Sequence, residues 1–387
     1  MSEGMNVVHV ITGLGNGGAE GALFRLVTSD TRYRHEVVSL TDKGLFGPRL
    51  EARGIPVHCL EMPRGRLTFR GVIRLYRLLR ARRSAVVQTW MYHADLLGGV
   101  IGRLAGCRNI VWGIRASDAH EHSPGRMARL VVLCGAWLSR VVPRRIVYAS
   151  HSGARVHTAA GYASDRVSII PNGFDARCLH SDPSLRRTQR SHWNVQQSIA
   201  ILGTVARWDP LKDHATLAAA LRFLSELAYQ FDWLAVWVGP GMTKDNAELV
   251  TLLQHYGLEK KVILHGPSID IPMIMSAIDI HVLSSSSEAF PNVLAEAMAC
   301  GTPCVATDVG DARHIVADTG WIVPLRDPGA LSASIRTALA AMTDREEWAK
   351  RQAKCIARTA SKFGLSAMVT AYHDVWQFST DARYGAK

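Results

Sequence analysis

The chain has 387 residues, of which 48% are hydrophobic and 20% charged, a globular composition that excludes a disordered or fibrous protein and has room for two ordinary domains. Its seven cysteines are scattered and form no C-x-x-C pair, which argues against a zinc ribbon or a disulfide scaffold. The formal net charge of +12 indicates an anionic partner, such as a nucleic acid, a membrane face or a small anion.

The first half alternates strand-like and helix-like segments. Apolar, β-rich runs predict strands over 7–12, 36–40, 57–60, 86–89, 109–113, 145–149 and 168–171. Helical spacing lies between them, for example over 19–27 and 48–53. Because such alternation is typical of a parallel, doubly wound sheet, we expect a Rossmann-like domain over 1–180.

Two features concern the membrane and the compartment. The N-terminus lacks the basic and long apolar regions of a signal peptide. The longest apolar run, 130–138, is too short for a bilayer, which needs about 20 residues. We therefore expect a cytoplasmic protein.

A glycine loop follows the first predicted strand. Gly13, Gly15 and Gly18 match G-x-G-x-x-G, and Asp42 could be read as the acid that binds a ribose. The literal interpretation is a nicotinamide dehydrogenase. A different diphosphate ligand or an acceptor fits the same chemistry, because the following helix offers free amides to an anion. A purely structural turn is the third interpretation.

The stretch between Met62 and Ala94 contains no acidic residue. Its arginines are Arg64, Arg66, Arg70, Arg74, Arg77, Arg80, Arg82 and Arg83. The apolar residues among them have helical spacing, which predicts a basic amphipathic helix over 64–83. Such a helix suits an anionic membrane surface, or it packs on its domain with a solvated arginine face. No nucleic-acid signature accompanies it, so we expect no nucleic-acid partner.

A polar stretch over 182–197 is expected to be an inter-domain linker. A second Rossmann-like domain is then expected over 198–365. Strands are predicted over 199–205, 233–238, 262–264, 280–283 and 303–306, and helices over 214–228, 248–256, 291–300, 330–341 and 345–359. A final helix, in 366–387, is expected to pack back on the first domain.

The segment from Ser284 to Cys304 joins a strand to a helix. Pro291 stands at a helix start, and the first amides of that helix, at Asn292, Val293 and Leu294, can cradle a phosphate. Glu288 precedes the helix and Glu296 lies about one turn into it. Two carboxylates beside a phosphate site suit two sets of sugar hydroxyls. The alternative is a capping glutamate and a solvated one.

Positive charge for a diphosphate is available after the strand 199–205. Arg207 can bind two phosphate oxygens at once, and Lys212 acts as a point charge. A surface pair of the same residues is the alternative. Since the chain has no D-x-D motif, we expect side chains rather than a metal to supply the cations, and no cofactor.

Taken together, these motifs resemble those of the retaining glycosyltransferases of family 4, of the bacterial lipopolysaccharide and O-antigen type. The motifs are Gly17-Gly18-Ala-Glu20, Pro171-Asn172-Gly173, Arg207 with Lys212, the pair Glu288 and Glu296 in E-x7-E spacing, and the stretch around His93. The resemblance implies the GT-B fold, in which two Rossmann-like domains face a deep cleft, with the acceptor on the first domain and the nucleotide sugar on the second.

The resemblance also implies roles for individual residues. Arg207 and Lys212 would hold the diphosphate, Glu288 the donor hexose and Glu296 the ribose. Gly17 and Gly18 would border the diphosphate and the acceptor, His93 would lie beside the reacting carbon, and Gly266 with Pro267 would face the base. His93 could instead be structural. Two departures from the family pattern, Ala289 and the stretch Asp311 to His314, leave the donor sugar open.

The partners implied are a nucleotide-diphosphate sugar, with UDP favoured, and a saccharide or lipid-linked acceptor reached through peripheral contact with an anionic membrane. Two alternatives remain at this point: a nucleotide-sugar epimerase of the same fold, and an NAD-dependent dehydrogenase suggested by the glycine loop.

Overall fold

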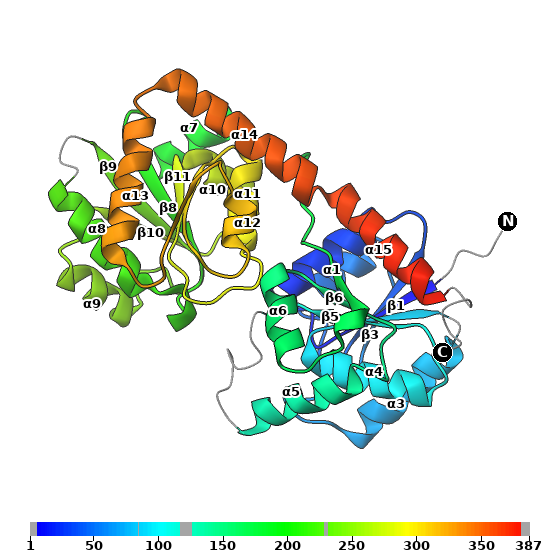
Figure 1. Ribbon diagram of the computed structural model, residues 1–387. Helices are drawn as coiled ribbons and strands as arrows, with labels where there is room; N and C mark the ends of the chain where they lie inside the picture. The colour runs from blue at the N-terminus through cyan, green and yellow to red at the C-terminus, as the bar shows by residue number, and fades with distance from the viewer. Residues whose placement is uncertain (1–5, 84, 117–125, 228–230, 381–387) are drawn as a thin grey trace. The chain divides into compact units, whose positions relative to one another are not determined.

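The computed structural model describes residues 6–83, 85–116, 126–227 and 231–380 (Figure 1). They form two compact units. The first comprises the described residues up to Gly173 and from Leu365 onwards, and the second runs from Phe174 to Gly364. Among the helices in these ranges, none combines the length and the apolar character needed to cross a bilayer.

The first unit contains a parallel sheet with the strand order β3-β2-β1-β4-β5-β6-β7. Its strands are β1 (Asn6–Ile11), β2 (Arg34–Ser39), β3 (Val57–Cys59), β4 (Val86–Trp90), β5 (Ile110–Ile114), β6 (Arg145–Tyr148) and β7 (Val167–Ile169). Its helices are α1 (Gly18–Ser29), α2 (Phe46–Glu51), α3 (Phe69–Ala81), α4 (Tyr92–Leu104), α5 (Arg126–Leu138), α6 (His151–Ala159), the short η1 (Ser164–Arg166) and α15 (Leu365–Thr380).

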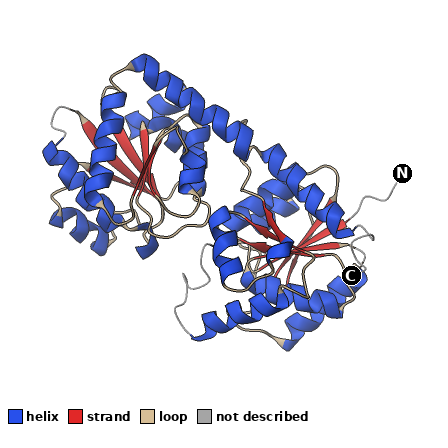
Figure 2. Ribbon diagram, viewed as in Figure 1, coloured by secondary structure: helices blue, strands red, loops and turns tan. Residues whose placement is uncertain are grey.

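Helices cover both faces of this sheet (Figure 2). The side chains of β1 alternate between the faces, as strand geometry requires. Val7 and Ile11 pack with α1 and α15, whereas Val8 and Val10 pack with α3, α4 and α5. In α15, the Trp376 indole donates a 3.1 Å hydrogen bond to Gln88 of β4. Residues 381–387, the end of the expected C-terminal helix, lie outside the described residues.

The second unit contains a parallel sheet with the order β10-β9-β8-β11-β12-β13. Its strands are β8 (Ala200–Val205), β9 (Trp233–Val238), β10 (Val262–Gly266), β11 (Ile280–Leu283), β12 (Cys304–Thr307) and β13 (Trp321–Val323). Its helices are α7 (Pro183–His192), the short η2 (Pro210–Lys212), α8 (His214–Leu227), α9 (Ala247–His255), α10 (Ile271–Ala277), α11 (Asn292–Ala299), α12 (Ala312–Val316), α13 (Pro328–Ala341) and α14 (Arg345–Phe363).

The expected linker over 182–197 is wrong for most of its length. Residues Pro183–His192 form α7, which belongs to the second unit and packs against α10. Asp182 caps this helix by accepting from the Ser184 amide at 2.7 Å. Arg186 and Arg190 both form ion pairs with Asp279, at 2.7 and 2.5 Å, and Arg190 is completely buried. Charge pairing with a buried partner therefore helps to fix a polar helix.

The expected basic helix over 64–83 begins later than its arginines suggest. Helix α3 starts at Phe69, and the hydroxyl of Thr68 caps it by accepting from the Gly71 amide at 3.2 Å. Arg64 and Arg66 therefore lie in the loop between β3 and α3. Along α3, Leu75 and Leu79 are buried and the side chains of Arg74 and Arg77 are exposed.

Both sheets reverse their strand order at one point. In the first unit the chain leaves β1 towards β2 on one side and returns to β4 on the other. In the second, β8 lies between β9 and β11. In open α/β sheets, ligands bind outside the carboxyl ends of the strands at such a switch point. The loops after β1, β4, β8 and β11 are therefore the places to look for a site.

Candidate active site

In the second unit, the loops after β8 and β11 meet at the switch point. Lys212 follows β8 and Glu288 follows β11, and the Lys212 Nζ lies 2.5 Å from Glu288 Oε1. Both side chains are mostly buried. The Ser285 hydroxyl donates to the same Oε1 at 2.9 Å. Two of the predicted site residues are therefore in direct contact, although 76 positions separate them in the chain.

The serine run after β11 also fixes the loop that carries Lys212. The Ser284 hydroxyl donates to the Lys212 carbonyl at 2.8 Å, and the Ser286 amide donates to the Leu211 carbonyl at 2.8 Å. The Thr307 hydroxyl, at the end of β12, donates to the Ser285 carbonyl at 2.7 Å. These hydrogen bonds join the ends of β8, β11 and β12, so that Lys212 and Glu288 are positioned before any ligand binds.

Arg207 lies at the rim of this cluster and is half exposed. Its Nε donates to Asp209 at 2.9 Å. Burial tends to raise the pKa of Asp209, but hydrogen bonds from the Leu211 amide and from Arg207 outweigh it and lower that pKa. His214 Nε2 lies 3.1 Å from the Arg207 carbonyl oxygen, and its ring stacks on Trp208 with 5.2 Å between ring centroids. Burial lowers the pKa of His214, so a neutral ring supports the Arg207 loop.

Helix α11 begins one residue later than expected. Pro291 is its N-cap, and the helix runs from Asn292. The Leu294 amide, expected to be available for a phosphate, already donates to the Pro291 carbonyl at 3.1 Å. Asn292 and Val293 form the first turn, and Glu296 lies half-buried in the same helix.

The loop after β12 supports the backbone that leads into α11. The Asp311 amide donates to the Ala289 carbonyl at 3.0 Å. Gly310 adopts a φ of 56°, in the left-handed region, and a Cβ there would collide with the carbonyl oxygens of Glu288 and Ala289. Only glycine suits this position, and because it has no side chain the loop can approach the segment that carries Glu288.

Gly266 and Pro267 lie at the end of β10, on the same edge of the sheet but beyond β9. Gly266 accepts from the Gly239 amide at 2.8 Å, and its own amide donates to the Met242 carbonyl at 2.9 Å. These bonds join the ends of β9 and β10. No direct contact with Lys212 or Glu288 is found for either residue in the described parts of the chain.

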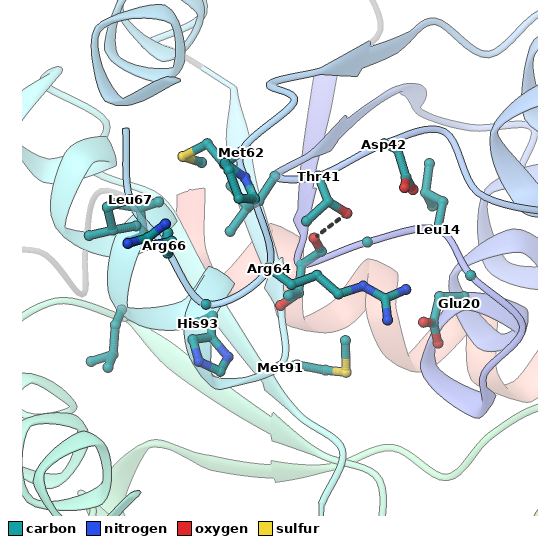
Figure 3. Close-up of a pocket in the computed structure, with 18 of the residues that line it drawn as sticks. Leu14, Glu20, Thr41, Asp42, Met62, Arg64, Arg66, Leu67, Met91 and His93 are labelled. Atoms are coloured by element: carbon teal, nitrogen blue, oxygen red, sulfur yellow. Dashed lines mark hydrogen bonds between the residues drawn. The ribbon is translucent and has the colours of Figure 1, made fainter. Parts of the chain in front are cut away.

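In the first unit, a cavity of about 630 Å³ opens at the other switch point. It is lined by the loops after β1 and β2, the loop between β3 and α3, and the first turns of α4 (Figure 3). His93 lines it, as do Gly13, Gly15 and Glu20. Gly17 and Gly18 form the start of α1 and are not among its lining residues.

Two features make the start of α4 unusual. Met91, its N-cap, has φ 71° and ψ 157°, a combination that is essentially confined to glycine and that costs about 1–3 kcal/mol. Asp95 lies buried beneath it, accepting from the Thr89 hydroxyl at 2.5 Å and from the Gly113 amide at 3.1 Å. Burial raises the pKa of Asp95 to about 7. Backbone strain of this kind recurs at functional sites, and here it lies two residues before His93.

Several residues of these sites were not singled out as site residues from the sequence. Ser285 and Gly310 support Glu288, and Arg64 and Arg66 line the cavity of the first unit. The serine run after β11 and the isolated glycine after β12 were visible signals for the first two. The two arginines were missed because the helix was predicted to start at Arg64, whereas α3 starts at Phe69.

Two family descriptions match successive parts of the chain. Residues 16–177 match "Glycosyltransferase Family 4", and residues 197–341 match "Glycosyl transferases group 1". The first range covers β2 to β7 of one sheet, and the second covers β8 to β13 of the other. The chain therefore carries glycosyltransferase domains, and the G-x-G-x-x-G loop does not mark it as a nicotinamide dehydrogenase.

The Escherichia coli protein named UDP-Gal:alpha-D-GlcNAc-diphosphoundecaprenol alpha-1,3-galactosyltransferase is 24% identical over 313 residues, which is 79% of each chain. A D-inositol 3-phosphate glycosyltransferase of Geodermatophilus obscurus is 31% identical over 223 residues, 54% of this chain and 49% of that one.

Among solved structures, Anabaena HepE in complex with UDP is 22% identical with a TM-score of 0.82, covering 97% of this chain and 100% of that one. The same protein with UDP-glucose also gives 0.82. The predicted GT-B fold, with two parallel Rossmann-like sheets, is confirmed.

Proposed function

For a chain that carries glycosyltransferase domains in a GT-B fold, we propose retaining, metal-independent transfer of a hexose from a UDP-sugar to a saccharide or lipid-linked saccharide. The role proposed is the synthesis of a bacterial surface polysaccharide, of the lipopolysaccharide or O-antigen kind. The observation that carries the proposal is the ion pair between Lys212 and Glu288, 2.5 Å long, at the switch point beside the start of α11.

The comparisons support the donor and the acceptor class. The name of the Escherichia coli relative specifies UDP-galactose and a diphosphoundecaprenol acceptor, and HepE was solved with UDP and with UDP-glucose. Arg207 and Lys212 supply two cations for the diphosphate, which is the reason to expect no metal.

Each remaining residue has a proposed role. Glu288 binds hexose hydroxyls through Oε2, since Oε1 already accepts from Lys212 and Ser285. Glu296 binds the ribose, Asn292 and Val293 offer backbone amides to the phosphates, and Gly266 with Pro267 borders the base. In the first unit His93 lies beside the reacting carbon, and Gly17 with Gly18 borders the ligand.

The chemical step breaks the bond between the sugar C1 and the β-phosphate oxygen. Negative charge grows on the departing UDP, and Arg207 and Lys212 stabilise it from fixed positions. The acceptor oxygen attacks C1 from the face that UDP leaves. Its proton passes to the departing phosphate oxygen, so no protein carboxylate is needed as the base.

Peripheral binding to an anionic membrane belongs to the same proposal. In the first unit, α3 and α5 both pack against α4, on one face of the sheet. The arginines of α3 are exposed, and α5 exposes Leu130, Leu133 and Trp137 at helical spacing, each more than half accessible. An apolar ridge and a basic helix face, on two helices that both pack against α4, are the pattern of a membrane-surface element.

The test is product analysis with the purified protein. It is incubated in EDTA with UDP-glucose, UDP-galactose or GDP-mannose and with a GlcNAc-diphosphate-lipid acceptor. We expect UDP release that depends on the acceptor and an α-linkage by NMR from the α-configured donor. A β-linked product, a requirement for a divalent ion, or isomerisation of the donor without an acceptor would each overturn part of the proposal. The last result would identify an epimerase.

A further inference from the structure

The turn that carries His93 is held by its backbone and not by the histidine itself. Met91 and His93 lie at the start of α4, and both line the cavity of the first unit (Figure 3). The His93 side chain is exposed, and no hydrogen bond of its imidazole is found among the described residues. Its orientation therefore depends on the groups that fix the turn around it.

Three hydrogen bonds close a ring around this turn. The Met91 amide donates to the Gly113 carbonyl at 2.8 Å, the Gly113 amide donates to Asp95 Oδ1 at 3.1 Å, and the Asp95 amide donates to the Met91 carbonyl at 2.9 Å. The same Oδ1 accepts from the Thr89 hydroxyl at 2.5 Å. One carboxyl oxygen thus joins the ends of β4 and β5 to the first turn of α4, and the ring holds Met91 at its positive φ of 71°.

The residue between Met91 and His93 has an anchor of its own. The Tyr92 hydroxyl lies 2.5 Å from Nε2 of His157, which is buried in α6. His157 Nδ1 in turn donates to the Gly153 carbonyl at 2.7 Å. His93 therefore lies between two residues, Tyr92 and Asp95, that are each tied to other elements of the unit.

Asp95 acts through one oxygen. The side chain is buried, and its Oδ2 has no hydrogen-bond partner among the described residues. The ionisable groups that face it are Arg115, Tyr148 and Tyr162. Burial raises the pKa of Asp95 to about 7, so the side chain is largely neutral below that pH. The turn therefore requires an acceptor at Oδ1 rather than a negative charge.

We propose that Asp95 is a positioning residue for sugar transfer, which holds the strained Met91 turn and thereby places His93 in the cavity. Asp95 is not among the residues that line the cavity, so it acts through the backbone and not on a ligand. The inference rests on the proposed transferase function and on the role proposed there for His93.

The test is steady-state transfer kinetics with the full chain. Asp95→Leu removes the acceptor, and we expect kcat to fall about 10- to 100-fold, because a misplacement of about 1 Å can cost about 10²-fold. KM for the UDP-sugar should change by less than about twofold, since the proposed donor residues belong to the second unit. Asp95→Asn keeps an acceptor oxygen in the same place and should retain kcat within about threefold.

A double-mutant cycle shows whether Asp95 acts through His93. In a His93→Ala background, Asp95→Leu should lower kcat by less than about a further threefold, because the side chain that Asp95 positions is gone. Thr89→Val removes the 2.5 Å donor to Oδ1 and should itself lower kcat about three- to tenfold. It takes the place of Asp95→Leu in the cycle if that variant does not fold.

Ser139→Ala is the matched control. The Ser139 hydroxyl is buried in the same unit, accepts from the Ala163 amide at 2.9 Å and lies outside the cavity. This variant should lose stability and keep its kcat. The inference is overturned by equal kcat in Asp95→Leu and Ser139→Ala, by effects of Asp95→Leu and His93→Ala that multiply, or by full activity of His93→Ala. In each of these cases transfer by the parent chain upholds the proposed function, whereas a parent chain that transfers no sugar from a UDP-sugar rejects that function itself.

Discussion

Replacing Lys212 by methionine tests the centre of the donor site. The change keeps most of the side-chain volume and removes the charge that lies 2.5 Å from Glu288. The loss of one preorganised donor to a developing negative charge costs about 10²–10³ in kcat, or about 2.7–4 kcal/mol. We therefore expect kcat for transfer to fall by that factor.

Stability should fall by a smaller amount. The Lys212 and Glu288 side chains are 18% and 15% exposed, so the pair is not fully desolvated. Ser285 still donates to the carboxylate at 2.9 Å in the variant. We expect a loss of about 1–3 kcal/mol in the free energy of unfolding, below the 3–5 kcal/mol typical of a broken, fully buried pair. For a unit of this size each kcal/mol lowers Tm by about 2–4 °C.

The assay combines steady-state transfer kinetics, measured well below the Tm of the variant, with a thermal melt. Lys350→Met is the matched control, because Lys350 pairs with Glu346 at 2.8 Å on an exposed helix face, where such pairs contribute about 0–1 kcal/mol. Adding Glu288→Gln to Lys212→Met should restore part of the stability, since the unpaired carboxylate is gone, but none of the activity. A Lys212→Met enzyme with kcat within threefold of the parent would refute the reasoning.

Three further predictions follow from other parts of the structure. His281 is fully buried, and burial lowers its pKa to about 4. As the pH falls below about 6.5, this histidine therefore binds a proton in the unfolded chain but not in the folded chain. Stability is therefore lost on acidification, and His281→Leu should lose about 2 kcal/mol less than the parent between pH 7 and 5 in urea melts. Gly310→Ala should lower both Tm and kcat, because its Cβ meets the loop that leads into α11. Leu133→Glu/Trp137→Glu should reduce flotation with anionic liposomes at least about tenfold. Burial of each of these exposed apolar side chains in the membrane surface would contribute about 1.5–3 kcal/mol to binding.

Two of these have a control variant. For Gly310 it is Gly54→Ala, at φ 75° with nothing within 4 Å of the added Cβ, which should cost only about 1–2 kcal/mol and no activity. For the α5 ridge it is Ile269→Glu, 88% exposed in the second unit, which should float like the parent. Equal acid sensitivity with and without His281, equal kinetics for both glycine variants, or unchanged flotation of the α5 variant would contradict the respective argument.

The strand ends that carry the donor site could be predicted from the sequence because they depend on local patterns. Apolar runs end shortly before Ser284 and before Arg207. Each indicates a buried strand, and the residues that follow it lie at the carboxyl end of that strand, where a site is expected. The contact between Lys212 and Glu288 could not be derived in this way. It requires β8 and β11 to be neighbours, and their order depends on how the crossover helices pack over the whole sheet.

Helix α7 was missed for a related reason. Its sequence is polar, and a low content of apolar residues is typical of a linker. The partner that makes it a packed helix is Asp279, about ninety positions later, which pairs with Arg186 and Arg190. A charged side chain that is buried in an ion pair with a distant residue leaves no signal in the neighbouring sequence. The composition of its segment matches that of a segment exposed to solvent.

The arginine-rich stretch demonstrates how one error in a helix boundary changes a functional interpretation. Read as a single helix from Arg64, all its charges would face one surface and serve one partner. Because Thr68 caps the helix at Phe69, the charges divide. Arg64 and Arg66 line the cavity, whereas Arg74 and Arg77 stay on the outer face of α3. Charge reversal at the second pair should therefore impair flotation with anionic liposomes, whereas reversal at the first pair should leave flotation unchanged.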